Sequence, residues 1–197
     1  MPKRTTGITT ASLNRFVIDA GAVYVNFGEV DERLLGATRD GNTFAIEVEM
    51  REMDIDGVRQ AVKGTKRVTS VAASVTCNLL ELSAENLALS LTGSTLGEWK
   101  ETGDPAFTHD TIRRSREIGS MDYVKNIAIV GKVNNTGENF IGIIYNALAS
   151  GGLELSLEDE NEAAVELTFT AHIDPDDIED NGTYLEAWEI RMPKATA

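Results

Sequence analysis

Alternation of apolar and polar residues, one by one, is the feature of this sequence that most limits how it can fold. The clearest run spans residues 163–174. Its apolar positions are Val165, Leu167, Phe169, Ala171 and Ile173, and its polar positions are Glu166, Thr168, Thr170 and His172. A period of two residues is typical of a β-strand with one buried and one solvated face. Runs at 43–51 and 70–79 repeat the pattern, so we expect a largely antiparallel β protein.

Further segments bring the expected number of strands to eight or nine. Residues 123–133 and 139–148 are apolar on both sides and flank the Gly-containing loop 134–138, which predicts a hairpin that is central or covered by a partner. Residues 16–27 suggest two short strands around Ala20 and Gly21, residues 153–158 alternate Leu with Glu or Ser, and residues 185–192 suggest a closing strand. Turn residues at 28–42, including Asp40 and Gly41, and at 56–64 argue against core strands there.

One segment predicts a helix. Ser83 is a suitable N-cap for residues 83–91, Leu87 and Leu91 share a face, and Gly93 can end the helix. The predicted fold class is therefore all-β with a minor α-helix, as a β-sandwich or half-barrel in a single domain over residues 1–197. Residues 97–122 are polar and are expected to form a long loop or arm, and such loops are usually functional or disordered.

The charge is unevenly distributed. The chain of 197 residues has a formal net charge of −14, and residues 133–190 contain 14 acids and no Lys or Arg. The rest of the chain is neutral. This balance argues against a broad phosphate-binding surface, because such surfaces need Lys and Arg. The acidic third is either a solvated face with acidic loops, or a surface that meets a second copy of the chain or repels polyanions.

The sequence offers little catalytic or metal-binding chemistry. Cys77 is the one cysteine, His109 and His172 are the two histidines, and no phosphate loop, nucleophile elbow or zinc motif is present. Residues 174–182 resemble the start of a calcium loop read from Asp177, but Trp188 then stands where a bidentate Glu is needed. We expect no enzyme activity, no cofactor and no metal. No signal peptide and no membrane-spanning segment are expected either.

The order of several segments resembles the major tail tube proteins of long-tailed bacteriophages. The resemblance lies in Val17–Phe27 with its Asp-Ala-Gly step, Leu35–Gly41 (LGATRDG), the strand 44–50, and Asp56–Lys63 (DGVRQAVK). A Lys-Gly-Thr segment, the strand 68–82 and the Ser-Ala-Glu-Asn helix follow in the same order. It covers about residues 14–92, and the rest of the chain is similar in architecture.

This resemblance implies a structural virion protein of the phage tail, made in the host cytoplasm. Its inner strands would join a ring-wide β-barrel when six copies form a ring, and rings would stack into a tube. The lumen would house the tape measure protein and then conduct genomic DNA as a non-specific passenger. Tail terminator and tail-tip proteins would be further partners.

Two sets of residues are predicted to act in such an assembly. The first would face the lumen, on the polar side of its strands: Glu47, Glu49, Glu166, Thr168 and Thr170. The second would pair between neighbouring subunits, arginines against acids: Arg113, Arg114 and Arg116 with Asp174, Asp176, Asp177, Glu179 and Asp180.

Two alternatives stay open at this stage. A tube subunit of another injection machine, such as the type VI secretion tube, shares the architecture but conducts protein effectors, and the acidity favours a DNA conduit. A β-sandwich carbohydrate-binding module is a different class. Aromatic residues make up only 6% of the chain, and Trp99 and Trp188 lie far apart in sequence.

Overall fold

The computed structural model describes residues 7–100, 102, 108–114, 117–157, 159, 161–179 and 186–194. Ten strands occur in these ranges: β1 (Val17–Val25), β2 (Arg33–Leu34), β3 (Thr38–Glu52), β4 (Lys66–Leu79), β5 (Ser94–Lys100), β6 (Thr108–Arg114), β7 (Val124–Val133), β8 (Asn139–Ala149), β9 (Val165–Thr170) and β10 (Trp188–Arg191). The helices are α1 (Ala84–Ser90) and α2 (Pro175–Glu179), with 3-10 turns at Thr10–Arg15 and Ser120–Asp122. The predicted all-β class with a minor helix is confirmed.

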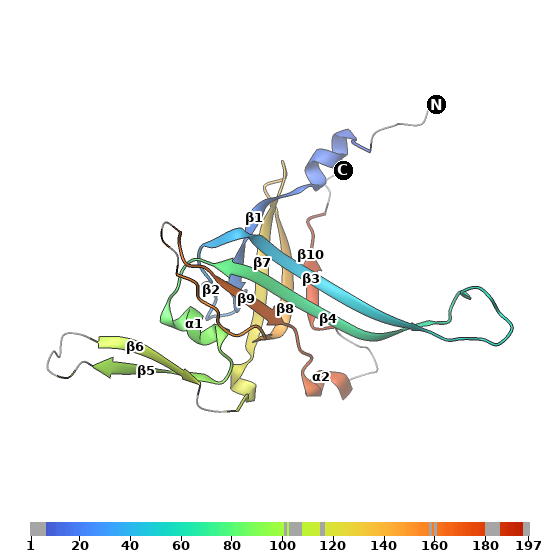
Figure 1. Cartoon of the computed structure of the whole chain (residues 1–197). Coiled ribbons are helices and arrows are strands. Elements are labelled where there is room, and N and C mark those ends of the chain that lie inside the picture. Colours follow the sequence, from blue (N-terminus) through green and yellow to red (C-terminus); the bar gives the residue numbers. More distant parts are fainter. Residues whose placement is uncertain are drawn as a thin grey trace.

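All strand pairs are antiparallel, and eight strands belong to one sheet, seven of them in a continuous path (Figure 1). Its order is β2-β1-β7-β8-β9-β4-β3, with β10 added beside β8. Only the last two residues of β8, Leu148 and Ala149, pair with β9. The path therefore divides into one layer around β7 and β8 and a second layer of β9, β4 and β3. The core between them contains Val23, Val75, Ile127, Ile144 and Phe169, each fully buried.

The alternating strands and the apolar hairpin follow the sequence prediction. Val165, Leu167 and Phe169 of β9 are buried, as are the alternate residues 73, 75, 77 and 79 of β4. In the hairpin, β7 lies between β1 and β8, and its residues 126–129 are all buried. Burial on both faces explains why these two strands lack alternation.

Residues 16–27 form one strand, not the two that their Ala-Gly step suggested. Between the pairs Ile18–Lys132 and Ala22–Val130, β1 has two more residues than β7, and Asp19 and Gly21 take φ values of 103° and 76°. This bulge absorbs the turn residues without ending the strand. The side chain of Asn42 donates hydrogen bonds to the carbonyl oxygens of Ala20 and Gly21, at 3.0 and 2.9 Å, and fixes the bulge.

The turn predicted at Asp40 and Gly41 is also a bulge. Arg39 pairs with Asn78 and Asn42 with Cys77, so the two intervening residues, both with positive φ, have no partner on β4. Consequently β3 begins at Thr38, inside a segment that its turn residues had excluded from the strands. The bulges of β1 and β3 meet at Asn42, so the first two segments of the family resemblance lie side by side.

The helix forms where it was predicted. The Ser83 hydroxyl accepts a hydrogen bond from the Asn86 backbone N–H at 3.2 Å, which caps the first turn. The buried Asn86 amide donates to the carbonyl oxygen of Leu35 at 2.8 Å, and Leu87 and Leu89 pack against the core. These contacts hold α1 at the side of the body.

The described residues between 97 and 122 contain strands, where a long loop was expected. β5 and β6 pair over seven residues each, from Ser94–Arg114 to Lys100–Thr108. This two-stranded sheet has polar residues on both faces and projects from the body beside α1 (Figure 1). A hairpin without an apolar face leaves no alternation in the sequence, so it is read as a loop.

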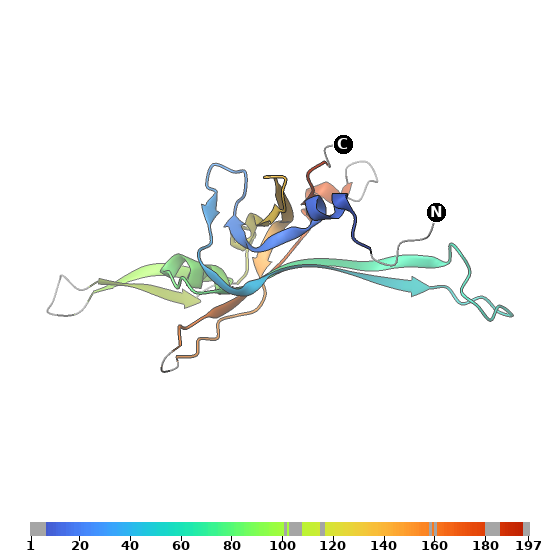
Figure 2. The ribbon, with the colours of Figure 1, turned by 90° about the horizontal axis from the view of Figure 1, so that it is seen from above.

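The hairpin of β3 and β4 is the longest projection of the molecule. Its two strands leave the body together and end in the loop 53–65, far from the β5–β6 hairpin (Figures 1 and 2). Among the described residues, no helix is both long and apolar enough to cross a membrane.

Candidate assembly surfaces

The five residues predicted to face a lumen share one face of the sheet β3-β4-β9. Residues that stand directly opposite each other in antiparallel strands point to the same side. The residues of β4 opposite the predicted set are Ser70 and Ala72 for Glu49 and Glu47, and Ser74, Thr76 and Asn78 for Thr170, Thr168 and Glu166. These are alternate residues of β4, so all ten side chains lie on the same side.

This polar face carries three glutamates among many short side chains, and Arg39, Arg51 and Arg67 lie toward its ends. Glu47, Glu49 and Glu166 are exposed, while Thr168 and Thr170 are half-buried. The hydroxyl oxygens of Thr76 and Thr168 lie 3.1 Å apart and link β4 to β9. The result is a polar surface with three carboxylates and three guanidinium groups, on the side of the sheet away from the core.

The other face of the β3–β4 hairpin is apolar beyond the point where the core ends. Phe44 and Ile46 pack against the core, but Val48, Met50 and Val68 on the same face are between 45 and 59% exposed. Val71 stands opposite Val48, and Val68 stands opposite Met50. More apolar side chains are exposed around the tip of the hairpin: Met53, Ile55, Val58 and Val62. Contiguous exposed apolar surface of this kind marks an interaction site.

A signal for this surface is present in the sequence. The alternation of β3 continues to Met50, and further apolar residues follow on both sides of Asp56 and Gly57. Alternation identifies the apolar face of a strand. It does not show where the opposite layer stops covering that face.

The arginines and acids predicted to pair between subunits lie on separate elements. Arg113 and Arg114 are exposed on β6, and the Arg114 Nε donates to the Thr92 carbonyl oxygen at 3.1 Å. Asp174, Asp176 and Asp177 are exposed around the start of α2. Arg116, Asp180 and the Glu179 side chain lie outside the described residues. In the part of the chain that the structure describes, no ion pair joins the two groups.

Residues 174–179 of the segment that resembles a calcium loop have a different structure, and residues 180–182 lie outside the described residues. Residues 175–179 form the short helix α2, and the Asp174 carboxylate accepts a hydrogen bond from the Asp176 backbone N–H at 3.1 Å. Asp174 is therefore used as a helix cap. The described residues contain no group of three His, Cys, Asp or Glu side chains placed to hold a metal ion.

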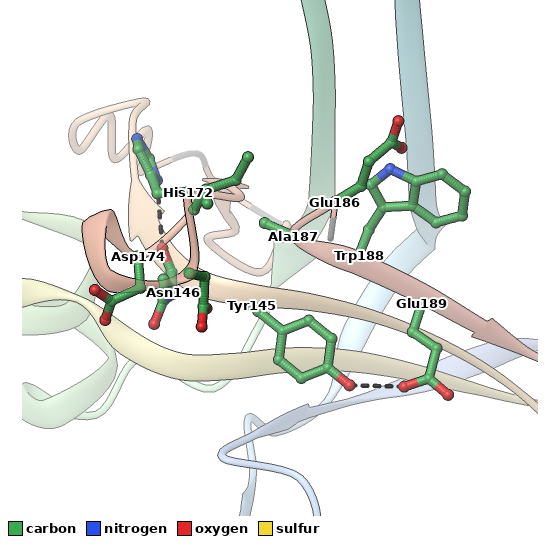
Figure 3. A pocket seen from close by; sticks show the side chains of 10 residues that line it. Tyr145, Asn146, His172, Asp174, Glu186, Ala187, Trp188 and Glu189 are labelled. Carbon is green, nitrogen blue, oxygen red and sulfur yellow. Dashed lines mark hydrogen bonds between the residues drawn. The ribbon is translucent and has the colours of Figure 1, made fainter. Parts of the chain in front are cut away.

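A cavity of about 350 Å³ lies between the end of β8, the start of β10 and residues 172–177 (Figure 3). Its polar centre is Glu189, which accepts hydrogen bonds from the Tyr145 hydroxyl at 2.7 Å and from Arg191 at 2.8 and 2.9 Å. The Arg191 and Tyr145 hydrogen bonds lower the pKa of Glu189 to about 2. Burial, followed by the bond to Glu189, raises the pKa of Tyr145, so its phenol stays protonated at neutral pH. This group holds β10 to β8 and provides no base or nucleophile.

His172 lies at the same cavity. Its place in the alternation predicted a solvated strand face, and this prediction is wrong. β9 ends at Thr170, so the alternation no longer applies to residue 172. The His172 Nδ1 lies 3.1 Å from the Thr170 carbonyl oxygen and 3.3 Å from that of Asn146, and its ring meets the Tyr123 ring edge to face. Because carbonyl oxygens only accept hydrogen bonds, Nδ1 carries the proton. His172 therefore holds the turn that follows β9.

Comparison with known proteins gives a likeness in structure. Neither the protein-family models nor the curated proteins give a match to this chain. Among the solved structures, the chain is similar to the tail of an empty GTA particle, determined by helical refinement with C6 symmetry. The TM-score is 0.44 and the sequence identity is 8%, over 79% of this chain and 92% of the other.

Proposed function

We propose that this chain is the major structural subunit of a phage tail tube. Six copies form a ring, rings stack into a tube, and the polar face of β3-β4-β9 lines the lumen. The lumen houses the tape measure protein in the assembled virion and conducts genomic DNA into the host. Tail terminator and tail-tip proteins cap the two ends of the tube. The protein has no catalytic role.

The observation that carries this proposal is the amount of surface that the monomer leaves uncovered. The chain exposes 14460 Å², whereas a compact monomer of its mass, 21.4 kDa, exposes about 9,100 Å². An obligate interface buries about 2,000–5,000 Å² counted over both partners, so an excess of about 5,000 Å² on one chain corresponds to burial in several interfaces. The projecting β3–β4 hairpin is part of it, since Val48, Met50 and Val68 are between 45 and 59% exposed. A subunit that is buried on several sides in an assembly accounts for this shape.

The middle of the polar face supports a conduit for DNA. Phosphates are bound by Lys and Arg, which this face carries toward its ends, as Arg39, Arg51 and Arg67. The glutamates and small hydroxyl residues between them repel a negative duplex and keep it moving through the lumen. The order of segments that resembles the tail tube proteins, including the two that meet at Asn42, supports the same function.

Electron microscopy tests the proposal directly. Purified protein is examined by negative stain and light scattering over a range of concentrations, with and without tail-tip complexes to initiate assembly. We expect six-fold rings or hollow tubes. The double variant Met50→Asp/Val68→Asp should stay monomeric with an unchanged circular dichroism spectrum. The control Val30→Asp, at a fully exposed residue of the loop between β1 and β2, should assemble. A wild-type protein that stays monomeric under all these conditions would refute the proposal.

Charge reversal tests the role of the polar face. Particles that carry the three glutamates of this face as lysines should form tubes and release DNA more slowly, because the lysines would bind passing phosphates. Substituting the same residues by glutamine removes the repulsion of DNA phosphates without adding an attraction, so it separates the two effects. Unchanged release kinetics in intact particles would contradict a lumenal position.

The predicted pairing of arginines and acids contributes to the contacts between subunits. Each exposed ion pair contributes only about 0.2–1 kcal/mol, so the pairs matter through repetition around the ring. Replacing Arg113, Arg114 and Arg116 by alanine should impair polymerisation in a salt-dependent way and leave the monomer folded. Polymerisation that is as efficient as that of the wild type at every salt concentration would exclude the pairing.

A further inference from the structure

The layer β9-β4-β3 has two open edges, one on each side. At one edge, β3 pairs with β4 and, within the described residues, with no other strand. At the other edge, β9 pairs with β8 only through Phe169 and Thr170, so its first four residues have no ladder beyond β4. Unpaired edges attract further strands, and folded proteins cover them.

Residues 151–157, which we name the leucine segment, run along the open edge of β9. The Ser150 backbone N–H donates to the Thr168 carbonyl oxygen at 2.9 Å, and the chain then continues beside β9 without regular pairing. An open groove separates the two, lined by Gly152, Leu153 and Glu166 among others. The sequence Leu-Glu-Leu-Ser-Leu alternates as a strand does, yet no strand forms here, contrary to the prediction for residues 153–158.

The alternation of this segment fits the sheet that it borders. Continuing the pairing of Ala149 with Phe169 places residues 153, 155 and 157 on the apolar face and Glu154 and Ser156 on the polar face. Leu153, Leu155 and Leu157 are nevertheless 39, 43 and 80% exposed. The monomer therefore has two bare apolar stretches on the same side of one layer, one at each edge.

The two edges cannot meet within one chain, because β9 and β4 lie between them. They can meet between copies. The leucine segment, β9, β4 and β3 make four strands, each antiparallel to the next. Because four is an even number, the first strand of one copy and the last strand of the neighbouring copy also run in opposite directions. The leucine segment of one copy would then run antiparallel to β3 of its neighbour. Such a head-to-tail contact closes into a ring.

Charge selects the register of this contact. The leucine segment carries Glu154 and no base, and β3 carries Arg51 on its polar face, one residue beyond Met50. With Leu155 opposite Met50, Leu157 stands opposite Val48 and Glu154 stands opposite Arg51. Opposite charges and apolar pairs directly across antiparallel strands each stabilise the pairing.

We propose that the leucine segment of one copy becomes a β-strand in the assembly and pairs with the outer edge of β3 in the next copy, Leu155 opposite Met50. The proposal rests on the proposed ring-forming function and names the two chain segments that close the ring. In this proposal, the leucine segment forms the backbone hydrogen bonds of a strand only when a partner copy binds.

Disulfide cross-linking tests the contact and its register. A chain with Leu155→Cys and Met50→Cys should oxidise within tubes to a ladder of covalent multimers that ends at the hexamer. The matched control, Leu155→Cys with Arg51→Cys, places the second thiol on the opposite face and should stay largely monomeric on a denaturing gel. The native Cys77 does not interfere, because it is buried and burial raises its pKa to about 12.

Proline and hydrogen exchange supply a second readout. Leu155→Pro removes a backbone N–H that the new strand needs and should abolish ring formation without changing monomer stability, while Leu155→Val should assemble. Amides of residues 152–157 should exchange fast in the monomer and slowly in tubes. Wild-type tubes in which these amides still exchange fast, or in which the 155–50 pair fails to cross-link, would refute this contact and leave the tube function intact. The absence of tubes would refute both.

Discussion

Substitution of Gly142 by alanine tests how the long β3–β4 hairpin is anchored to the body. Gly142 is a buried residue of β8, and a Cβ there would lie 3.0 Å from Cδ2 of Phe44 and 3.2 Å from its Cε2 and Cγ. Its φ is not positive, so alanine strains the packing and not the backbone. Phe44 belongs to β3, at the root of the projection. The new methyl group therefore presses on the ring that holds the hairpin.

The size of the effect follows from these distances. Carbon atoms pack best at about 3.5–4.0 Å, so the Phe44 ring must move by about 0.5 Å. Overpacking of this kind costs about 1–3 kcal/mol. The lower backbone entropy of alanine in the unfolded chain offsets about 0.5–1 kcal/mol of it. We expect Gly142→Ala to lower the free energy of unfolding by about 1 kcal/mol.

A double-mutant cycle isolates the contact. Phe44→Ala removes a half-buried ring and should cost about 2 kcal/mol, roughly half of the value for a fully buried one. Without the ring, Gly142→Ala should become neutral or stabilising, which gives a coupling of about 1–2 kcal/mol between the two changes. Urea unfolding of the monomer, followed by circular dichroism, measures all four proteins. Gly151→Ala is the control, because its Cβ would lie at an ordinary 4.0 Å from the Thr168 backbone nitrogen. Effects that add within about 0.5 kcal/mol would refute the contact.

Three other substitutions or probes test the interior. The pKa of Glu189 is lowered to about 2, so its bonds to Arg191 stabilise the fold above the ordinary carboxyl pKa of 4.5, and this stability is lost as the pH falls toward 2. Because Glu189 is 43% exposed, Glu189→Gln should remove only about 0.2–1 kcal/mol at neutral pH and flatten the acid dependence of unfolding. Cys77 should react with a thiol reagent only after unfolding, and rapid labelling of the native protein would contradict its burial. Asn126→Ala should cost about 1–3 kcal/mol in urea unfolding, because the buried amide accepts from the Phe27 N–H at 2.6 Å and donates to its carbonyl oxygen at 3.1 Å. An unchanged midpoint would show that this loop is held by other contacts.

Local signals predicted the elements whose causes are local. Alternation identified β3, β4 and β9 and the buried face of each, since a strand that packs on one side needs apolar residues at every second position. Ser83 placed the start of α1, since a side-chain oxygen can cap the free N–H groups of that turn. The loop 134–138 placed the hairpin of β7 and β8.

The same kind of signal failed where a turn residue is used for another purpose. Gly21 and the Asp40–Gly41 pair have the positive φ that turns require, but β7 and β4 keep pairing on both sides of them. Whether a positive φ ends a strand or bends it depends on the neighbouring strand, which a local sequence window does not contain. The polar β5–β6 hairpin was missed for a related reason, because its strands have no buried face to alternate.

The sequence by itself determined which side chains share a face, and that is why the five residues of the predicted lumen lie together on one side of β3-β4-β9. Only the tertiary structure decided which faces and edges are covered. One side of β3 is apolar from Phe44 to Met50. The opposite layer covers Phe44 and Ile46 but leaves Val48 and Met50 exposed. The leucine segment has the pattern of a strand and lacks a ladder within the chain. Periodicity depends on the chain alone, whereas burial depends on what packs against it.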